Sequence, residues 1–172
     1  MLIGGPAQGG FSYAKLKGEK GVFVLARSVE STALSWAIER GTCAIQPGDV
    51  ESVTLTKNKS VLKLVSDRGE FKLGENPGRE ISTQRLETIA EALRNMIAEG
   101  AAHLGSARKE EGFDKPALEI RARRREGRGE IHVVIGAGDV YRGVSVFYAR
   151  REGVDATFAL PAARVRALLD AL

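Results

Sequence analysis

Two stretches near opposite ends of the chain constrain its fold more than any other feature. Residues 12–25, SYAKLKGEKGVFVL, align without a gap with residues 147–160, FYARREGVDATFAL. At an offset of 135 positions, five of the 14 residues are identical. The match extends towards the N-terminus, through an Ile-Gly pair, if the first copy is three residues shorter. We therefore predict an internal repeat. The alternative is that two β-hairpins converged on similar turns.

The repeat divides the chain into a partial and a complete unit. Residues 1–42 are predicted to be the C-terminal part of a preceding unit, a hairpin followed by a helix, and residues 43–172 the complete unit. Alternating apolar and polar residues predict three strands, a helix, four strands and a helix in the complete unit. The predicted fold class is α+β: an antiparallel sheet with two helices packed on one face, plus a partial N-terminal copy of the same unit.

Several local features follow from the same patterns. Residues 4–10 and 135–143 are rich in turn residues and are predicted to be turns, and residues 101–116 a loop. Helices are predicted for residues 28–41, for residues 82–100 with Ser82 as N-cap and Gly100 as terminator, and after Pro161. Because a partial repeat leaves sheet edges unpaired, we expect residues 3–25 to pair with the complete unit or with another chain. Positions predicted to point inward in the first three strands are Val50, Val53, Leu55, Leu62, Leu64, Phe71 and Leu73.

The composition suits a folded domain without a disulfide or a membrane span. Hydrophobic residues make up 43% of the chain, and the net charge is +4. The one cysteine, Cys43, excludes an intramolecular disulfide and is predicted to be a buried, inert thiol. Since no apolar run approaches the roughly 18 residues that a span needs, and the N-terminus lacks a basic segment, we predict neither a membrane span nor a signal peptide.

No pattern predicts a catalytic, cofactor or metal site. His103 and His132 are predicted to be surface histidines, since neither has a second ligand at metal spacing. IGAGDVYRG, residues 135–143, leads into a strand rather than a helix and so lacks the helix N-terminus that a phosphate loop needs. Glu111 and Asp114 are predicted to cap a turn rather than to form an acid pair. We therefore expect a protein that is not an enzyme and binds no cofactor.

A run of arginines gives the main functional signal. An arginine face on one strand and its neighbour could follow an anionic partner such as a phosphate backbone. Only Tyr141 and Tyr148 lie near for base stacking, and three glutamates dilute the charge, so a solvated outer face is favoured. A nucleic-acid-binding domain is the alternative function. The candidate face consists of Arg121, Arg123, Arg125, Arg128, Arg150 and Arg151.

A series of short motifs resembles a known bacterial family. Gly112, Phe113, Asp114 and Pro116 form a Gly-apolar-Asp-x-Pro segment that enters a strand, and DVESVTL, residues 49–55, matches an opening strand. Phe71 stands where the family commonly has tryptophan. The order of these motifs resembles the family called domain of unknown function 4340. Further matching positions are Ile135, Gly136, Tyr148, Ala149, Arg150, Phe158 and Leu160.

The resemblance implies a role in the cell envelope. Members of the family carry an N-terminal membrane anchor followed by tandem copies of the unit, and many are associated with envelope or gliding-type ABC transport systems. The leading hypothesis is therefore a non-enzymatic interaction or scaffold module on the extracytoplasmic side of the membrane. The expected partner is a protein, either other repeats or an envelope or transport complex. We expect the chain to be a fragment of a longer protein.

Overall fold

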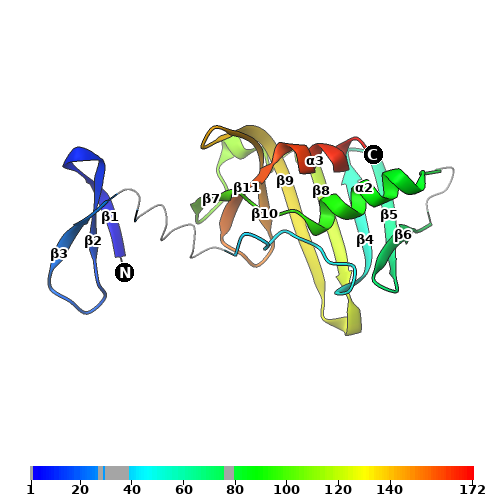
Figure 1. Ribbon diagram of the computed structural model, residues 1–172, viewed down its shortest axis with the longest axis horizontal. Coiled ribbons are helices and arrows are strands. Elements are labelled where there is room, and N and C mark those ends of the chain that lie inside the picture. Colours follow the sequence, from blue (N-terminus) through cyan, green and yellow to red (C-terminus); the bar gives the residue numbers. More distant parts are fainter. Residues whose placement is uncertain (1, 27–28, 30–38, 76–79) are drawn as a thin grey trace. The chain divides into compact units, whose positions relative to one another are not determined.

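The strands form two separate antiparallel sheets, which lie in two units (Figure 1). The computed structural model describes residues 2–26, 29, 39–75 and 80–172. The chain divides into Met1–Glu39, the first unit, and Arg40–Leu172, the second unit. Antiparallel sheets together with two described helices make the fold α+β, as predicted.

The first unit contains a three-stranded sheet in the order β1-β2-β3. The predicted turn over residues 4–10 is wrong for its first half, since Ala7 still belongs to β1 and only the last three residues form the turn η1. The strands pair with one another, so the described strands do not show pairing with the complete unit; pairing with another chain stays a prediction. The predicted helix over residues 28–41 lies mostly outside the described residues. The elements are β1 (Leu2–Ala7), η1 (Gln8–Gly10), β2 (Phe11–Lys15) and β3 (Val22–Leu25).

The second unit contains an eight-stranded sheet in the order β6-β5-β4-β8-β9-β10-β11-β7. Its two described helices, α2 and α3, lie side by side (Figure 1). Ion pairing of Arg164 with Glu91 at 3.0 Å joins them. The elements are β4 (Val50–Lys57), β5 (Ser60–Asp67), β6 (Glu70–Leu73), α2 (Thr83–Arg94), β7 (Gly100–Leu104), η2 (Lys109–Glu111), β8 (Leu118–Arg124), η3 (Arg125–Gly127), β9 (Glu130–Tyr141), β10 (Val144–Arg151), β11 (Ala156–Pro161) and α3 (Ala162–Leu169).

The core of the second unit follows the predicted alternation. On β8, Leu118, Ile120 and Ala122 are fully buried, and the residues between them are polar. Both described helices also contribute buried apolar side chains, among them Leu93 of α2 and Val165 of α3. Cys43 is also buried, as predicted, and this burial raises the pKa of its thiol to about 12. Of the inward positions predicted for the first three strands, all but the half-buried Leu73 are buried: Val50, Val53, Leu55, Leu62, Leu64 and Phe71.

The two described helices of the second unit begin where the sequence predicts. The Ser82 side chain accepts a hydrogen bond from the Arg85 backbone N–H at 3.3 Å, which confirms the predicted N-cap of α2. Pro161 stands at the N-cap of α3. The predicted end of α2 is wrong, because the helix stops at Arg94 and Gly100 instead begins β7.

Two segments that were predicted to be irregular are strands. Within the predicted loop over residues 101–116, β7 pairs antiparallel with β11. Its sequence, GAAHL, has no alternation of large apolar residues, and the neighbouring strand supplies the hydrogen bonds that order it. Residues 135–141, predicted as part of a turn, continue β9, and the chain turns only at Arg142 and Gly143, where φ is positive.

The hairpins of the two units have the same register. Tyr13 pairs with Val24 and Ala14 with Phe23, while 135 positions further Tyr148 pairs with Ala159 and Ala149 with Phe158. The preceding strands also agree, at an offset of 132. In each unit a β-bulge places two residues opposite one tyrosine: residues 4–5 opposite Tyr13, and residues 136–137 opposite Tyr148.

The loop between β7 and β8 packs on the second of these bulges. A Cβ atom at Gly136 would overlap the backbone carbonyl of Glu111 and lie 3.1 Å from the Phe113 ring. Gly112, with φ of 72°, lies beside Ala137. The Gly-apolar-Asp-x-Pro segment and the Ile-Gly pair, two motifs far apart in the sequence, therefore touch through a contact that requires glycine at position 136.

We predict that Gly136→Ala destabilises the second unit by about 3 kcal/mol, because the added methyl group pushes Glu111 and its loop away from the sheet. Urea denaturation followed by circular dichroism measures the effect. The matched control is Gly4→Ala in the equivalent bulge of the first unit, where the new Cβ meets only ordinary contacts of 3.5 Å or more. Equal effects of the two substitutions would contradict the proposed clash.

Candidate functional site

The six arginines of the predicted anionic-partner face have different surroundings. Arg121 and Arg123, on the exposed face of β8, pair with carboxylates: Arg121 lies 3.6 Å from Glu130, and Arg123 lies 3.1 Å from Glu51. Arg128, beyond η3, donates to the Arg125 carbonyl at 3.3 Å. Neighbouring carboxylates thus offset the charges that a phosphate backbone would need.

The other three arginines hold backbone together. Arg125 donates to the Gly48 carbonyl at 3.0 Å and to the Ser66 hydroxyl at 3.0 Å. Arg151 donates to the carbonyl of Thr42 at 2.6 Å, and Arg150 donates to that of Gly105 at 2.8 Å. These contacts do not support the nucleic-acid alternative; binding of an anionic partner stays a prediction, and Arg121 and Arg123 are the more exposed candidates.

We predict that Arg125→Ala lowers the free energy of unfolding by about 2 kcal/mol, since the half-buried Ser66 hydroxyl and the Gly48 carbonyl, on two different segments, lose their donor. Arg121→Ala should change it by less than about 0.5 kcal/mol, because its ion pairs are exposed. Thermal and urea denaturation compare the two. A loss at Arg121 as large as that at Arg125 would show that both arginines are structural.

A buried polar cluster lies under the loop between β7 and β8. Glu111, at the end of η2, is only 2% exposed. It contacts His103 on β7 through Nε2 of the ring and accepts from Thr157 Oγ1 on β11 at 3.1 Å. The prediction of a surface histidine at position 103 is wrong, because the loop folds back over β7 and leaves its side chain 12% exposed. His132 is also largely buried, between Glu119 and Glu152.

Internal hydrogen bonds satisfy this cluster. Glu111 also accepts from the Arg108 backbone N–H at 2.9 Å and so closes a turn, as predicted for a loop carboxylate. Burial acts to raise the pKa of Glu111, but the hydrogen bonds from Arg108, His103 and Thr157 outweigh it and lower that pKa. The other His103 nitrogen, Nδ1, lies 3.1 Å from the Leu104 carbonyl. Both ring nitrogens therefore face protein oxygens, an arrangement that orients the loop rather than a substrate.

We predict that Glu111→Gln destabilises the protein by about 2 kcal/mol at pH 7 and makes stability less sensitive to acid. Because folding lowers the pKa of Glu111, its ionised form contributes fully above the ordinary value of 4.5. That contribution is lost as the pH falls through the lower folded-state pKa. Urea denaturation at pH 7, 5 and 3 measures both effects. The matched control, Glu110→Gln, alters the exposed neighbour, and an equal pH profile for the two variants would contradict the role of Glu111.

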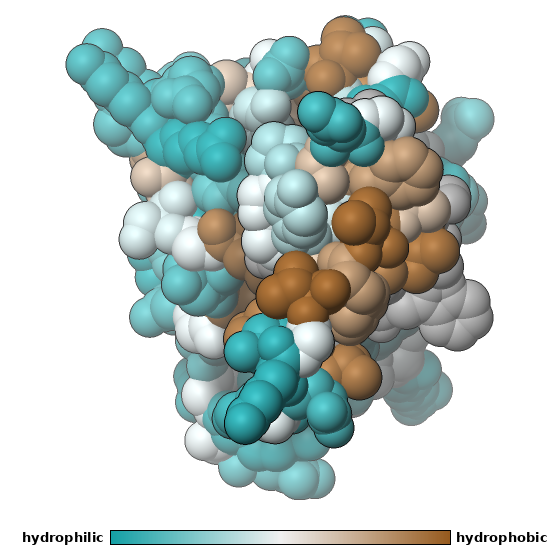
Figure 2. Space-filling model, turned by 90° about the vertical axis from the view of Figure 1, so that its left-hand side faces the viewer, coloured by the Kyte–Doolittle hydropathy of each residue, from teal (hydrophilic) through white to brown (hydrophobic). Residues whose placement is uncertain are grey.

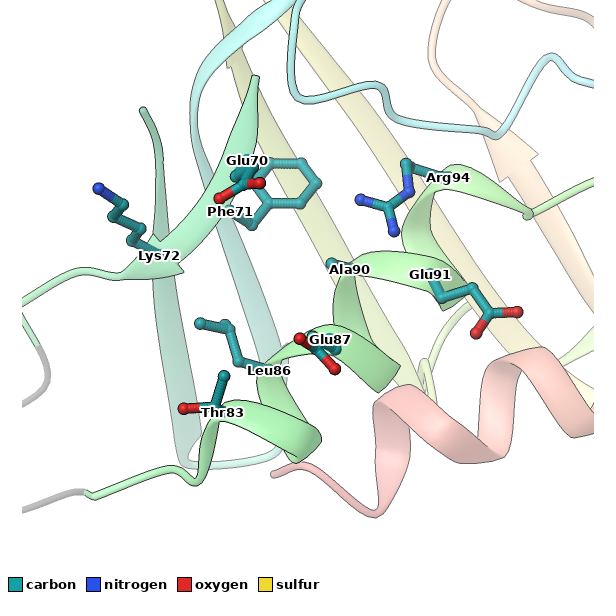
Figure 3. Close-up of a pocket in the computed structure, with 9 residues that line it drawn as sticks. All are labelled: Glu70, Phe71, Lys72, Thr83, Leu86, Glu87, Ala90, Glu91 and Arg94. Carbon is teal, nitrogen blue, oxygen red and sulfur yellow. The ribbon is translucent and has the colours of Figure 1, made fainter. Parts of the chain in front are cut away.

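The sequence did not indicate a cavity of about 600 Å³ that lies between edge strand β6 and helix α2. Phe71 points from β6 into the space beside α2, and Arg94 reaches back towards it (Figure 3). Phe71 and Ala90 make its buried apolar base. The remaining lining is mixed in charge, with Glu70, Lys72, Glu87, Glu91 and Arg94 beside Thr83 and Leu86.

The first unit carries the most exposed apolar surface. Pairing of Tyr13 with Val24 and of Leu2 and Val22 with Lys15 places these side chains on one face of the sheet, together with Phe11. We call Leu2, Phe11, Tyr13, Val22 and Val24 the open face; all are at least 42% exposed. Figure 2 shows hydrophobic side chains gathered in a patch among hydrophilic neighbours. Apolar surface of this kind on a sheet is typical of interaction sites.

Two classes of site receive no support. Across the described part of the chain, no three His, Cys, Asp or Glu side chains gather in a way that could hold a metal ion. Within the same ranges, neither helix has the length and apolar character that a membrane crossing requires.

These features define an α+β protein whose three-stranded unit precedes an eight-stranded one. The chain belongs to the family described as Domain of unknown function (DUF4340), whose model matches residues 1–116. This match confirms the family resemblance seen in the motifs. It spans the whole first unit and ends at Pro116, within the loop between β7 and β8 that covers the β9 bulge. No curated protein and no solved structure matches the chain.

Proposed function

We propose that the chain is a non-enzymatic interaction module of a bacterial cell-envelope protein, made of one partial and one complete copy of the same unit. The open face is the observation that carries this proposal. Exposed valine, phenylalanine and tyrosine side chains on one side of a small sheet favour contact with another polypeptide over contact with water.

The shared hairpin register supports the repeat. A chance likeness of turns would leave the pairing and the bulge free to differ, yet both hairpins pair in the same way and carry a two-residue bulge opposite tyrosine. The two described helices of the second unit belong to the same proposed unit. The first unit then corresponds to the C-terminal part of the same unit.

The polar clusters support a binding role over a chemical one. His103 and Glu111, a pair that could act as general base and its orienting carboxylate, direct their polar atoms at each other and at the protein backbone. The place in the envelope rests on the family resemblance, which also favours a protein partner, either other repeats or an envelope or transport complex.

A photo-crosslinking residue at position 24 tests the proposal. With the full-length chain expressed in its bacterium, we expect Val24 replaced by a photo-reactive phenylalanine to give discrete adducts with a polypeptide, identified by mass spectrometry. A contact face holds the probe against its partner, so the yield should be several-fold above that of the control.

The matched control places the same probe at Lys17, an exposed position in the turn of the same hairpin but outside the open face. Addition of unlabelled Val24→Lys protein should not lower the yield of the adduct, since that variant does not compete for the partner. Yields at positions 24 and 17 that do not differ would reject an interaction role for the open face.

A further inference from the structure

The second unit shows how the counterpart of the open face is covered. At the repeat offsets, Phe11, Val22 and Val24 correspond to Val146, Thr157 and Ala159. The first three are 42%, 63% and 53% exposed, whereas their counterparts are at most 1% exposed. The same sheet positions are therefore open in one unit and sealed in the other.

Residues 99–113 contact two of these counterparts, Thr157 and Ala159. Residues 99–113 first run along β11, where the Glu99 N–H donates to the Ala159 carbonyl at 2.8 Å and β7 pairs His103 with Thr157. The chain then turns, and the Gly105 carbonyl accepts from Arg150 at 2.8 Å. Finally, the Glu111 carboxylate accepts a hydrogen bond from the Thr157 hydroxyl, and the loop packs on the bulge at Gly136.

The first unit has the same three features that hold this segment in the second unit: a free strand edge, a cation and a glycine at the bulge. Its β3 forms the edge of the sheet, as β11 would without β7. Lys15 takes the place of Arg150, so a cation is retained where a carbonyl must be held. Gly4 takes the place of Gly136 and leaves room above the bulge. Main-chain pairing to an edge strand together with side-chain pockets is a common mode of peptide recognition.

The chemistry of the two faces differs at two points of the contact. Thr157, whose hydroxyl donates to Glu111, is replaced by Val22, and Asp139, which accepts from Tyr148 at 2.5 Å, is replaced by Ala7. A carboxylate placed where Glu111 lies would be buried against methyl groups without that donor, which is unfavourable. An apolar side chain would instead bury its surface on Val22 and Val24.

From these observations we propose that the open face binds a strand-and-loop segment of another polypeptide. The segment adds to the β3 edge as β7 adds to β11, and it carries an apolar side chain where the second unit has Glu111. This inference rests on the proposed interaction function and names its ligand class. It also explains why an unaltered second copy is a poor occupant, because its own segment presents Glu111.

A peptide titration tests the inference with the full chain. Two fluorescein-labelled peptides of residues 100–116 are compared by anisotropy, the native sequence and its Glu111→Leu form. We expect the Glu111→Leu peptide to bind at least tenfold more tightly. Which peptide binds more tightly distinguishes the two sites. If the peptides instead displaced the chain's own segment from the second unit, the native peptide with Glu111 would bind more tightly.

Substitutions in the chain show whether the peptide binds to the open face. Val22→Thr restores the hydroxyl and should shrink or reverse the tenfold preference, whereas Val24→Lys should abolish binding of both peptides. Because both positions are exposed, circular dichroism and urea denaturation should show unchanged folding. The fluorescein label is on the peptides, so the buried Cys43 of the chain is not modified.

Each other outcome rejects the inference. No binding below about 1 mM peptide, or equal binding of the two, would overturn it. So would dimerisation in sedimentation velocity that Val24→Lys abolishes, because two open faces would then cover each other. If crosslinks at Val24 persist in that case, the interaction function stands and only this binding mode fails. If neither assay gives a signal, the proposed function fails as well.

Discussion

The close approach of the Glu111 carbonyl to Gly136 is the contact on which the second unit depends. Because position 136 has no side chain, the loop after β7 can rest on the β9 bulge. Glu111 then reaches Thr157 and His103, and Arg150 holds the start of the loop through Gly105. One missing methyl group thus allows a polar cluster to close over a sheet face that would otherwise be exposed.

The first unit has the same bulge and hairpin register, but the corresponding face is exposed and more apolar. Its face replaces a buried threonine and alanine by Val22 and Val24, so hydrogen bonds to a carboxylate give way to apolar contact. In the proposed repeat, a few side chains would make the two hairpins selective for different segments. Selectivity of this kind would stop neighbouring repeats from exchanging their covering loops.

Features with a local cause could be predicted from the sequence, and features with a distant cause could not. Alternation on β8 and the Ser82 cap depend on neighbouring residues, and both were predicted correctly. Strand β7 has small residues without alternation and is ordered by β11. His103 is buried by a loop whose polar sequence resembles surface, and Arg151 finds its acceptor at Thr42, more than a hundred residues away.

The physics of exposed strands also favours a protein partner over nucleic acid. A phosphate backbone is held by unpaired cations, but Arg121 and Arg123 face carboxylates and Arg125 holds backbone. The open face instead combines apolar side chains with the edge of β3, a combination that promotes uncontrolled strand pairing unless something covers it. Lys15 and Lys17, beside the patch, limit such pairing without removing the apolar surface. An apolar face beside a free strand edge is the kind of surface that the proposed polypeptide segment would cover.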